Sequence, residues 1–259
     1  MEYKNIKTET LSPNIVQLTI DRESKLNALN SETIEEIISA FAQFKQDGTR
    51  VIIITGAGDR SFVAGADISE MHKANSEGVL EFARKGQQMI RDIELFPGIV
   101  IAAINGFALG GGCELSLGCD WMVGTENAKI GQPEVKIGVT PGFGGSQRLP
   151  RLIGKGHATK MIVDGLPITA QEAHRIGLLV KLFPDKETML KDCLENARAI
   201  LSNSFNAVSG SKQIIRRGLD MDLDNACQSE VDAFRLCFNH PDQSEGMGAF
   251  LEKRSANFE

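Results

Sequence analysis

The chain lacks the features that mark most nucleic-acid-binding, membrane and secreted proteins. Its net charge is −6, so it has no excess of the basic residues that phosphate backbones or anionic lipids require. No segment has the length and hydrophobicity of a transmembrane helix. The N-terminus carries no charged segment followed by an apolar run, which argues against secretion. We therefore expect a cytoplasmic protein without nucleic-acid or membrane partners.

Several motifs of cofactor and nucleophile chemistry are also missing. The five cysteines form no C-x-x-C pair and the four histidines form no H-E-x-x-H motif, so we expect reduced thiols and no metal site. Neither a P-loop nor a G-x-S-x-G elbow occurs. The fingerprint G-x-G-x-x-G fails twice, because Ser61 and Gln147 stand where the third glycine belongs. An NAD-dependent oxidoreductase is therefore a disfavoured alternative.

Hydrophobic residues make up 42% of the 259 residues, enough for a sizeable core, and their spacing predicts regular elements. Alternating or continuous apolar runs predict strands at 15–20, 51–54, 99–104, 121–123 and 178–183. Apolar residues at helical spacing, with capping residues before them, predict helices from about residue 31, over 77–96 and from Thr169. Strands that alternate with helices indicate an α/β fold.

The character of the chain changes after Pro184. No strand-like run follows that proline, and the apolar residues beyond it recur at helical spacing. We predict a core that holds the active site over residues 1–195 and a helical C-terminal region over residues 196–259.

Segment 104–114, I-N-G-F-A-L-G-G-G-C-E, is the most informative part of the chain. It is a strand, a turn, three glycines and the start of a helix. Glycine lets a ligand approach the backbone closely, and the first N–H groups of a helix lack intrahelical partners. The helix dipole adds positive potential. The segment therefore indicates an oxyanion site, although a tight strand–helix turn would use the same glycines.

Two glutamates and one further loop accompany that segment. Loop 61–67 follows the apolar strand at 51–54, where open α/β sheets bind ligands, or it is only a buried connection. Glu114 follows the three glycines, and Glu134 follows Gly-Gln-Pro. Each alone is typical of a helix start or an exposed loop. Together they could divide acid and base roles, because burial and mutual charge push two carboxyl pKa values apart.

Four segments together resemble the enoyl-CoA hydratase (crotonase) family, and within it most closely an enoyl-CoA hydratase. They are I-N-G-F-A-L-G-G-G-C-E-L, F-V-A-G-A-D-I-S-E-M, G-Q-P-E-V-K-I-G-V-T-P-G-F-G-G-S-Q-R-L and E-G-M-G-A-F-L-E-K-R. They occur in family order and spacing, and the resemblance runs from Ile15 to Phe258. It implies an α/β spiral of ββα turns with a helical C-terminal trimerisation region. It also implies a homotrimer or a dimer of trimers.

The resemblance implies an enzyme of fatty acid β-oxidation that adds water reversibly to a 2-enoyl-CoA and gives a 3-hydroxyacyl-CoA. It needs no cofactor beyond the coenzyme A of its acyl-CoA substrate. The N–H groups of Ala66 and Gly111 would form the oxyanion hole. Glu114 would take a proton from the attacking water, Glu134 would give a proton to C2, and Gly142 would help to position the water. Coenzyme A contacts are implied for Lys25, Leu26, Ala28, Ala64, Ala66, Asp67, Ile68, Phe250 and Lys253, the last two reaching a neighbouring subunit.

Two departures and two alternatives accompany this resemblance. Ser69 stands where many relatives have lysine, and Trp121 where they have smaller aliphatic residues. An enoyl-CoA isomerase would keep the oxyanion hole but not both glutamates. One RNA-binding branch of the family uses a basic helix, whereas the corresponding helix here begins with the acidic segment 31–36.

Overall fold

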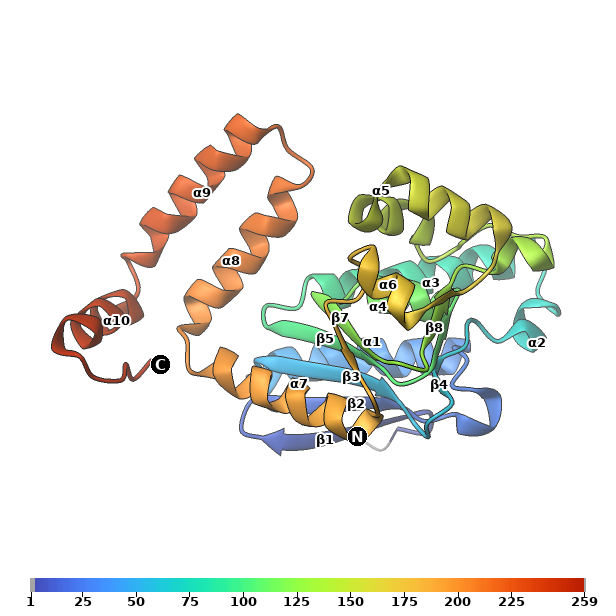
Figure 1. The fold of residues 1–259 in the computed structure, drawn as a ribbon, viewed down its shortest axis with the longest axis horizontal. Helices are drawn as coiled ribbons and strands as arrows, with labels where there is room; N and C mark the ends of the chain where they lie inside the picture. The colour runs from blue at the N-terminus through green and yellow to red at the C-terminus, as the bar shows by residue number, and fades with distance from the viewer. Residues whose placement is uncertain (1–2, 259) are drawn as a thin grey trace.

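The computed structural model describes residues 3–258, and Figure 1 shows a mixed α/β core with helices that extend away from it at the C-terminal end. The predicted α/β fold with a helical C-terminal part is confirmed. The strands form two sheets. The larger sheet contains β1 (Ile6–Ser12), β2 (Ile15–Ile20), β3 (Val51–Gly56), β5 (Ile99–Ile104), β7 (Trp121–Thr125) and β10 (Lys181–Phe183), in that order. The smaller sheet contains β4 (Ser61–Val63), β6 (Phe107–Leu109), β8 (Lys129–Gly131) and β9 (Ile168–Thr169).

Helices follow the paired strands and form the whole C-terminal part. Those that follow the core strands are α1 (Ser31–Gln46), α2 (Ile68–Met71), α3 (Ser76–Glu94), α4 (Gly111–Leu117), α5 (Gly145–Asp164) and α6 (Ala170–Arg175). The chain ends with α7 (Lys186–Leu201), α8 (Phe205–Gly218), α9 (Leu223–Cys237) and α10 (Pro241–Glu252). Two single turns of 3₁₀ helix are η1 (Glu23–Lys25) and η2 (Glu134–Ile137).

The chain runs as a spiral between the two sheets. Three times a strand of the larger sheet is followed by a strand of the smaller one and then by a helix: β3 and β4, β5 and β6, and β7 and β8. Strands β2, β3, β5, β7 and β10 pair in parallel, and only β1 joins the larger sheet antiparallel. The ends of β4, β6 and β8 therefore lie next to one another, and the loops that leave them meet.

Both faces of the larger sheet are buried, which explains its continuous apolar runs. In β3, Ile52 and Ile54 contact the main core beneath the helices, whereas Val51 and Ile53 contact the opposite cluster, which includes Met189 of α7. Strands covered on both sides need no polar alternation.

The predicted helix starts are confirmed by their capping bonds. Asn30 Oδ1 accepts a hydrogen bond from Thr33 N–H at 3.0 Å before α1, and Thr169 Oγ1 accepts one from Glu172 N–H at 3.2 Å before α6. These bonds satisfy N–H groups that have no partner within their helix.

Helices α8 and α9 pack against each other; α8 contacts the larger sheet's end through Lys212, whose Nζ donates to Gly98 O at 2.8 Å, whereas α9 and α10 extend away from the two sheets (Figure 1). Many of their apolar side chains are exposed, including Phe234 and Phe250. Helix α7 packs on the larger sheet and spans the predicted boundary at residues 195 and 196, so that division stays a prediction. Within residues 3–258, no helix is both long and apolar enough to cross a membrane.

Candidate active site

The first carboxylate of the site, Glu114, lies in α4 two residues after the last of the three glycines and is 2% exposed. Its Oε1 accepts hydrogen bonds from the N–H groups of Phe143 and Gly145, both at 2.8 Å. Burial raises the pKa of Glu114 above its ordinary value, while the two N–H groups and the charge of Arg148 act in the opposite direction. One carboxylate oxygen is thus held in place by the turn that precedes α5.

The second carboxylate, Glu134, opens η2 and is partly buried. Burial, and to a lesser extent the charge of Glu114, raise the pKa of Glu134 to about 7. With its amide nitrogen facing the carboxylate, the buried Gln132 donates to Glu134 Oε1 at 2.7 Å and to Oε2 at 3.1 Å. A Cβ built on Gly110 would lie 3.1 Å from Glu134 Oε1. This carboxylate therefore lies against the three-glycine turn.

Gln132 lies close to both carboxylate side chains. A Cβ built on Gly145 would lie 2.6 Å from the Gln132 side-chain amide, on the side opposite Glu134, and 3.0 Å from Glu114 Cγ, so both side chains pack against the same glycine. Glu134 and Glu114, twenty residues apart in the sequence, thus border one small site, with a buried amide between them. Burial raises the pKa of both carboxyl groups, and the charge of Glu114 raises the pKa of Glu134 further.

Two backbone N–H groups point into the same region. Leu29 forms a parallel bridge with Ala66, in which Leu29 N–H donates to Gly65 O and Asp67 N–H donates to Leu29 O. The N–H of Ala66 consequently points away from that bridge. Gly111 is the first residue of α4, where a helix N–H has no intrahelical acceptor. A Cβ built on Gly111 would lie 3.6 Å from Ala66 N, which places the two amides side by side.

Two of the three glycines are required by geometry. Gly110 has φ +50°, a left-handed conformation that side chains disfavour. A Cβ on Gly112 would lie 2.0 Å from Val63 O, so α4 can approach β4 this closely only with glycine there. Loop 64–67 and the start of α4 are therefore locked together, and the spacing of their amides is fixed by the backbone.

The comparisons with known proteins agree with this geometry. The family model "Enoyl-CoA hydratase/isomerase" matches residues 10–259. The chain belongs to the enoyl-CoA hydratase/isomerase family. It is 48% identical to crotonyl-CoA hydratase of Syntrophomonas wolfei (100% of this chain, 99% of the relative) and 46% identical to short-chain-enoyl-CoA hydratase of Clostridium acetobutylicum (98% and 97%). The crystal structure of an enoyl-CoA hydratase from Bacillus anthracis has a TM-score of 0.95 at 39% identity and covers 98% of this chain and 99% of that one.

Most residues for which the family resemblance implies coenzyme A contacts lie together at one rim of the site. Ala64 N–H donates to Leu26 O at 3.1 Å, which joins segments 25–28 and 64–68. Arg22 fastens the same two segments, since its guanidinium donates to Ala28 O and, at 3.1 Å, to Asp67 Oδ2. The ion pair is largely buried, with both side chains 14% exposed. Lys25 and Ile68 are exposed at this rim. The grouping fits a ligand-binding edge, and the contacts themselves stay predictions.

Phe250 and Lys253 are not brought to this rim within the subunit. They belong to the end of α10, which lies beyond α8 and α9 and away from the two sheets (Figure 1). The Phe250 side chain is 82% exposed. Their predicted contact with the coenzyme A of a neighbouring subunit stays a prediction.

Gly142, whose N–H is predicted to help position the water, lies directly before the turn that holds Glu114. Gly142 O accepts a hydrogen bond from Gln87 Nε2 at 2.9 Å, and the next amide, Phe143 N–H, binds Glu114. The role of Gly142 in positioning water stays a prediction. Sequence reasoning missed Gln132, although it lies within the G-Q-P-E motif, and it missed the amides of Phe143 and Gly145.

The two departures from the family pattern, Ser69 and Trp121, lie outside the group formed by Glu114, Glu134 and Gln132. Ser69 donates from Oγ to Asp67 Oδ1 at 2.5 Å and is exposed beside the rim. Trp121 packs in the cluster between the larger sheet and α7. Within residues 3–258, no three His, Cys, Asp or Glu side chains are grouped as a metal site.

Proposed function

We propose that this chain is an enoyl-CoA hydratase, which adds water reversibly to the double bond of a 2-enoyl-CoA and gives a 3-hydroxyacyl-CoA. The names of its relatives support this activity, since crotonyl-CoA hydratase and short-chain-enoyl-CoA hydratase are 48% and 46% identical to it. The substrate supplies its own coenzyme A, and the reaction requires no other cofactor. We further propose that the enzyme acts in the cytoplasm.

In the proposed mechanism, the thioester oxygen accepts hydrogen bonds from Ala66 N–H and Gly111 N–H. Negative charge moves onto this oxygen when water attacks C3, so both bonds strengthen in the transition state. Glu114 takes the proton of the attacking water, and Glu134 gives its proton to C2. The product gains one O–H group at C3 and one hydrogen at C2, and the two carboxyl groups end with exchanged protonation states.

The observation that carries this proposal is the pair of unlike carboxyl groups beside two adjacent amides. Glu114 accepts two backbone N–H bonds at 2.8 Å on one oxygen, and these bonds partly offset the burial that raises its pKa. Glu134 has a pKa of about 7, so a large share of it is protonated at neutral pH. One base and one acid in the same small site suit the addition of water. An isomerase, which moves a proton without adding water, would not need both.

We propose a preference for short acyl chains. The ring of Phe143 is 3% exposed and lies against Gly111, because a Cβ there would be 3.2 Å from the ring. The ring of Phe82 packs on it with centroids 5.3 Å apart. These two rings fill the space behind the paired amides and so limit the room for a long chain. The names of the two relatives support the same preference.

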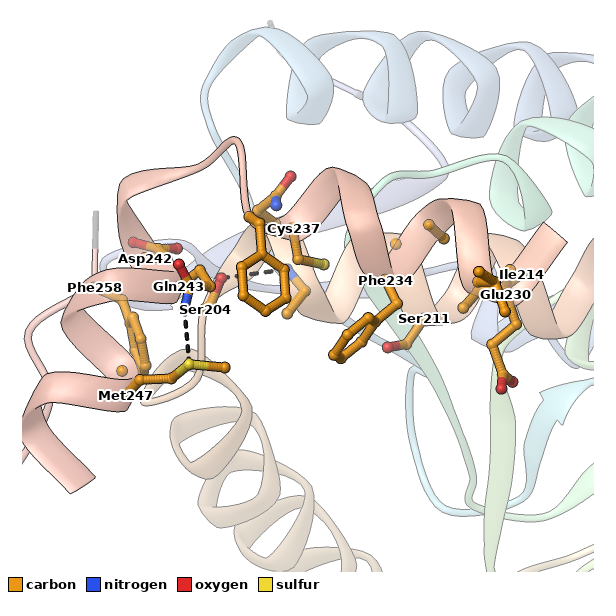
Figure 2. Close-up of a pocket in the computed structure, with 17 residues that line it drawn as sticks. Ser204, Ser211, Ile214, Glu230, Phe234, Cys237, Asp242, Gln243, Met247 and Phe258 are labelled. Atoms are coloured by element: carbon orange, nitrogen blue, oxygen red, sulfur yellow. Dashed lines mark hydrogen bonds between the residues drawn. The ribbon is translucent and has the colours of Figure 1, made fainter. Parts of the chain in front are cut away.

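We also propose that the protein forms a homotrimer, alone or as a dimer of trimers. Helices α8, α9 and α10 enclose a groove of about 680 Å³ that is lined largely by apolar side chains, and Figure 2 shows Phe234, Met247 and Phe258 along it. Phe250 and Leu251 of α10 are about four-fifths exposed. Apolar surface of this extent favours association. Sedimentation equilibrium tests it: a mass of three or six protomers supports the proposal, and a monomer contradicts it.

The direct test of the activity is the loss of enoyl-thioester absorbance when purified protein is mixed with crotonyl-CoA. Fast loss in the wild type and almost none in Glu114→Ala supports a hydratase. An isomerase would instead leave crotonyl-CoA unchanged and raise the absorbance of a 3-enoyl-CoA as the double bond moves into conjugation. That result would replace the proposed reaction but keep the family.

A further inference from the structure

Arg148 and Glu94 occupy positions that do not suit the dipoles of their own helices. Arg148 lies in the first turn of α5, where the helix dipole is positive, and Glu94 is the last residue of α3, where it is negative. Each charge is therefore disfavoured by its own helix. The two side chains nevertheless pair through a fork, with Nε to Oε1 at 2.6 Å and Nη2 to Oε2 at 2.9 Å. They are about one-quarter exposed, so solvent screens the pair only in part.

The remaining nitrogen of the guanidinium reaches the turn that holds Glu114. Arg148 Nη1 donates to Phe143 O at 3.1 Å. It also packs on Gly144, since a Cβ there would lie 2.0 Å from Nη1. Gly144 has φ +105°, so glycine serves both the turn and the close approach of the arginine. The guanidinium thus lies against the turn 143–145, which sends two N–H groups to Glu114 Oε1.

We propose that Arg148, fixed by Glu94, is a positioning residue for the proposed base Glu114. It holds turn 143–145 so that the N–H groups of Phe143 and Gly145 bind Oε1 and leave Oε2 to take the proton from water. This inference rests on the proposed hydratase function and goes beyond it, since Arg148 touches no substrate. Arginine suits the task because a single planar group meets a carboxylate and a backbone carbonyl at once.

Arg148 has a second effect on Glu114, through charge. Its positive charge lowers the pKa of Glu114, against the stronger raising effect of burial. Without that charge, more of Glu114 is protonated at a given pH and unable to accept a proton. The acid limb of the rate profile should therefore move to higher pH, and it should move further if the N–H bonds from Phe143 and Gly145, which also lower the pKa of Glu114, are weakened.

The experiment measures kcat, KM and the pH profile of crotonyl-CoA hydration in Arg148→Gln, Arg148→Lys and Glu94→Gln. We expect Arg148→Gln to lower kcat about tenfold to a hundredfold with KM within about twofold, because a small misplacement of a catalytic group has such an effect. Its acid limb should move upward in pH. Arg148→Lys keeps the charge, so its acid limb should move less than that of Arg148→Gln while kcat remains reduced. Glu94→Gln weakens the fork from α3 and should lower kcat in the same sense.

The matched control is Arg151→Gln, in the same helix. Arg151 is 60% exposed and donates to Gln147 O at 2.8 Å, away from turn 143–145. The Arg151→Gln variant should keep the wild-type kcat and pH profile. The inference is overturned if wild type hydrates crotonyl-CoA while Arg148→Gln, or Glu94→Gln where the former does not fold, keeps kcat within about twofold and the acid limb unmoved. If the wild type does not hydrate crotonyl-CoA, the proposed function is contradicted, and the role of Arg148 that rests on it is contradicted as well.

Discussion

Replacing Glu134 by glutamine should stabilise the protein at alkaline pH while it removes activity. The pKa of Glu134 in the folded protein is about 7, whereas its ordinary value is 4.5, and burial is the main cause of the increase. The folded state therefore binds this proton more tightly than the unfolded state does. The stabilising effect of that proton is complete below pH 4.5 and is lost as the pH rises through 7. Glutamine remains neutral throughout and avoids the loss.

The size of the effect follows from the difference between the two pKa values. A difference of about 2.5 corresponds to at most about 3.4 kcal/mol of unfolding free energy. The Glu134 side chain is only partly buried, so solvent screening reduces this to about 1–2 kcal/mol. Most of that difference should develop between pH 5 and pH 8, because the unfolded-state glutamate is already largely ionised at the lower value.

Urea unfolding of wild type and Glu134→Gln at pH 5 and pH 8 measures the effect. Protomer concentration has to be the same in all samples, because association stabilises the folded state by mass action. We expect the unfolding free energy of the variant, relative to that of wild type, to be about 1–2 kcal/mol higher at pH 8 than at pH 5. An equal difference at both pH values, or a variant that loses stability relative to wild type at pH 8, would refute the assignment of Glu134 as a buried carboxyl with a raised pKa.

Three further predictions concern catalysis and specificity. The kcat/KM for hydration should fall about tenfold per pH unit above pH 7, as Glu134 loses the proton it must donate, and a flat profile to pH 9 would argue against Glu134 as the acid. Gly111→Ala should lower kcat/KM about a hundredfold, because its methyl group would lie 3.6 Å from Ala66 N, where we propose that the thioester oxygen binds. Gly156→Ala, whose Cβ meets no atom within 4 Å, is the matched control and should resemble wild type; equal effects of the two changes would contradict the oxyanion assignment. Phe82→Ala should raise kcat/KM for trans-2-decenoyl-CoA relative to crotonyl-CoA at least about tenfold, since loss of the phenyl ring frees room for several methylene groups and one methylene alone has about this effect, and an unchanged ratio would contradict the proposed limit on chain length.

The elements with strong periodic patterns could be predicted from the sequence. The strand at 15–20 and the apolar runs at 51–54 and 99–104 were predicted because their side chains enter the core. The start of α1 was predicted because Asn30 is a capping residue placed before an amphipathic pattern. In these segments, burial and local chemistry favour the same structure.

Other elements show too little hydrophobic periodicity in the sequence to be predicted. Strand β1 has one buried residue in seven, because it lies at the edge of the larger sheet with its side chains mostly in solvent. The strands of the smaller sheet have two or three residues each, too few to display an alternation. Helix α5 contains Pro150 and is interrupted at Gly154, where φ is +78°, so its apolar spacing does not continue along one face.

The candidate site was predictable in its residues but not in its internal contacts. Glu114, Glu134 and the amide of Gly111 stand out because glycine and carboxylate motifs are local in the sequence. Their partners are not, since Glu114 binds amides about thirty residues away and Arg148 pairs with Glu94 more than fifty residues away. Those segments meet only because the chain folds as a spiral, and hydrophobic periodicity in the sequence does not predict which turn will contact which helix.

The most direct test of the central claim is a comparison of crotonyl-CoA hydration by wild type, Glu114→Gln, Glu134→Gln and the double variant. If the two carboxyl groups act as one acid–base unit, each single change lowers kcat by about a hundredfold or more, and the double change lowers it little further. The free energies of activation would then be far from additive. A single variant that keeps the wild-type kcat would contradict the account, because one carboxyl group would suffice for the addition of water.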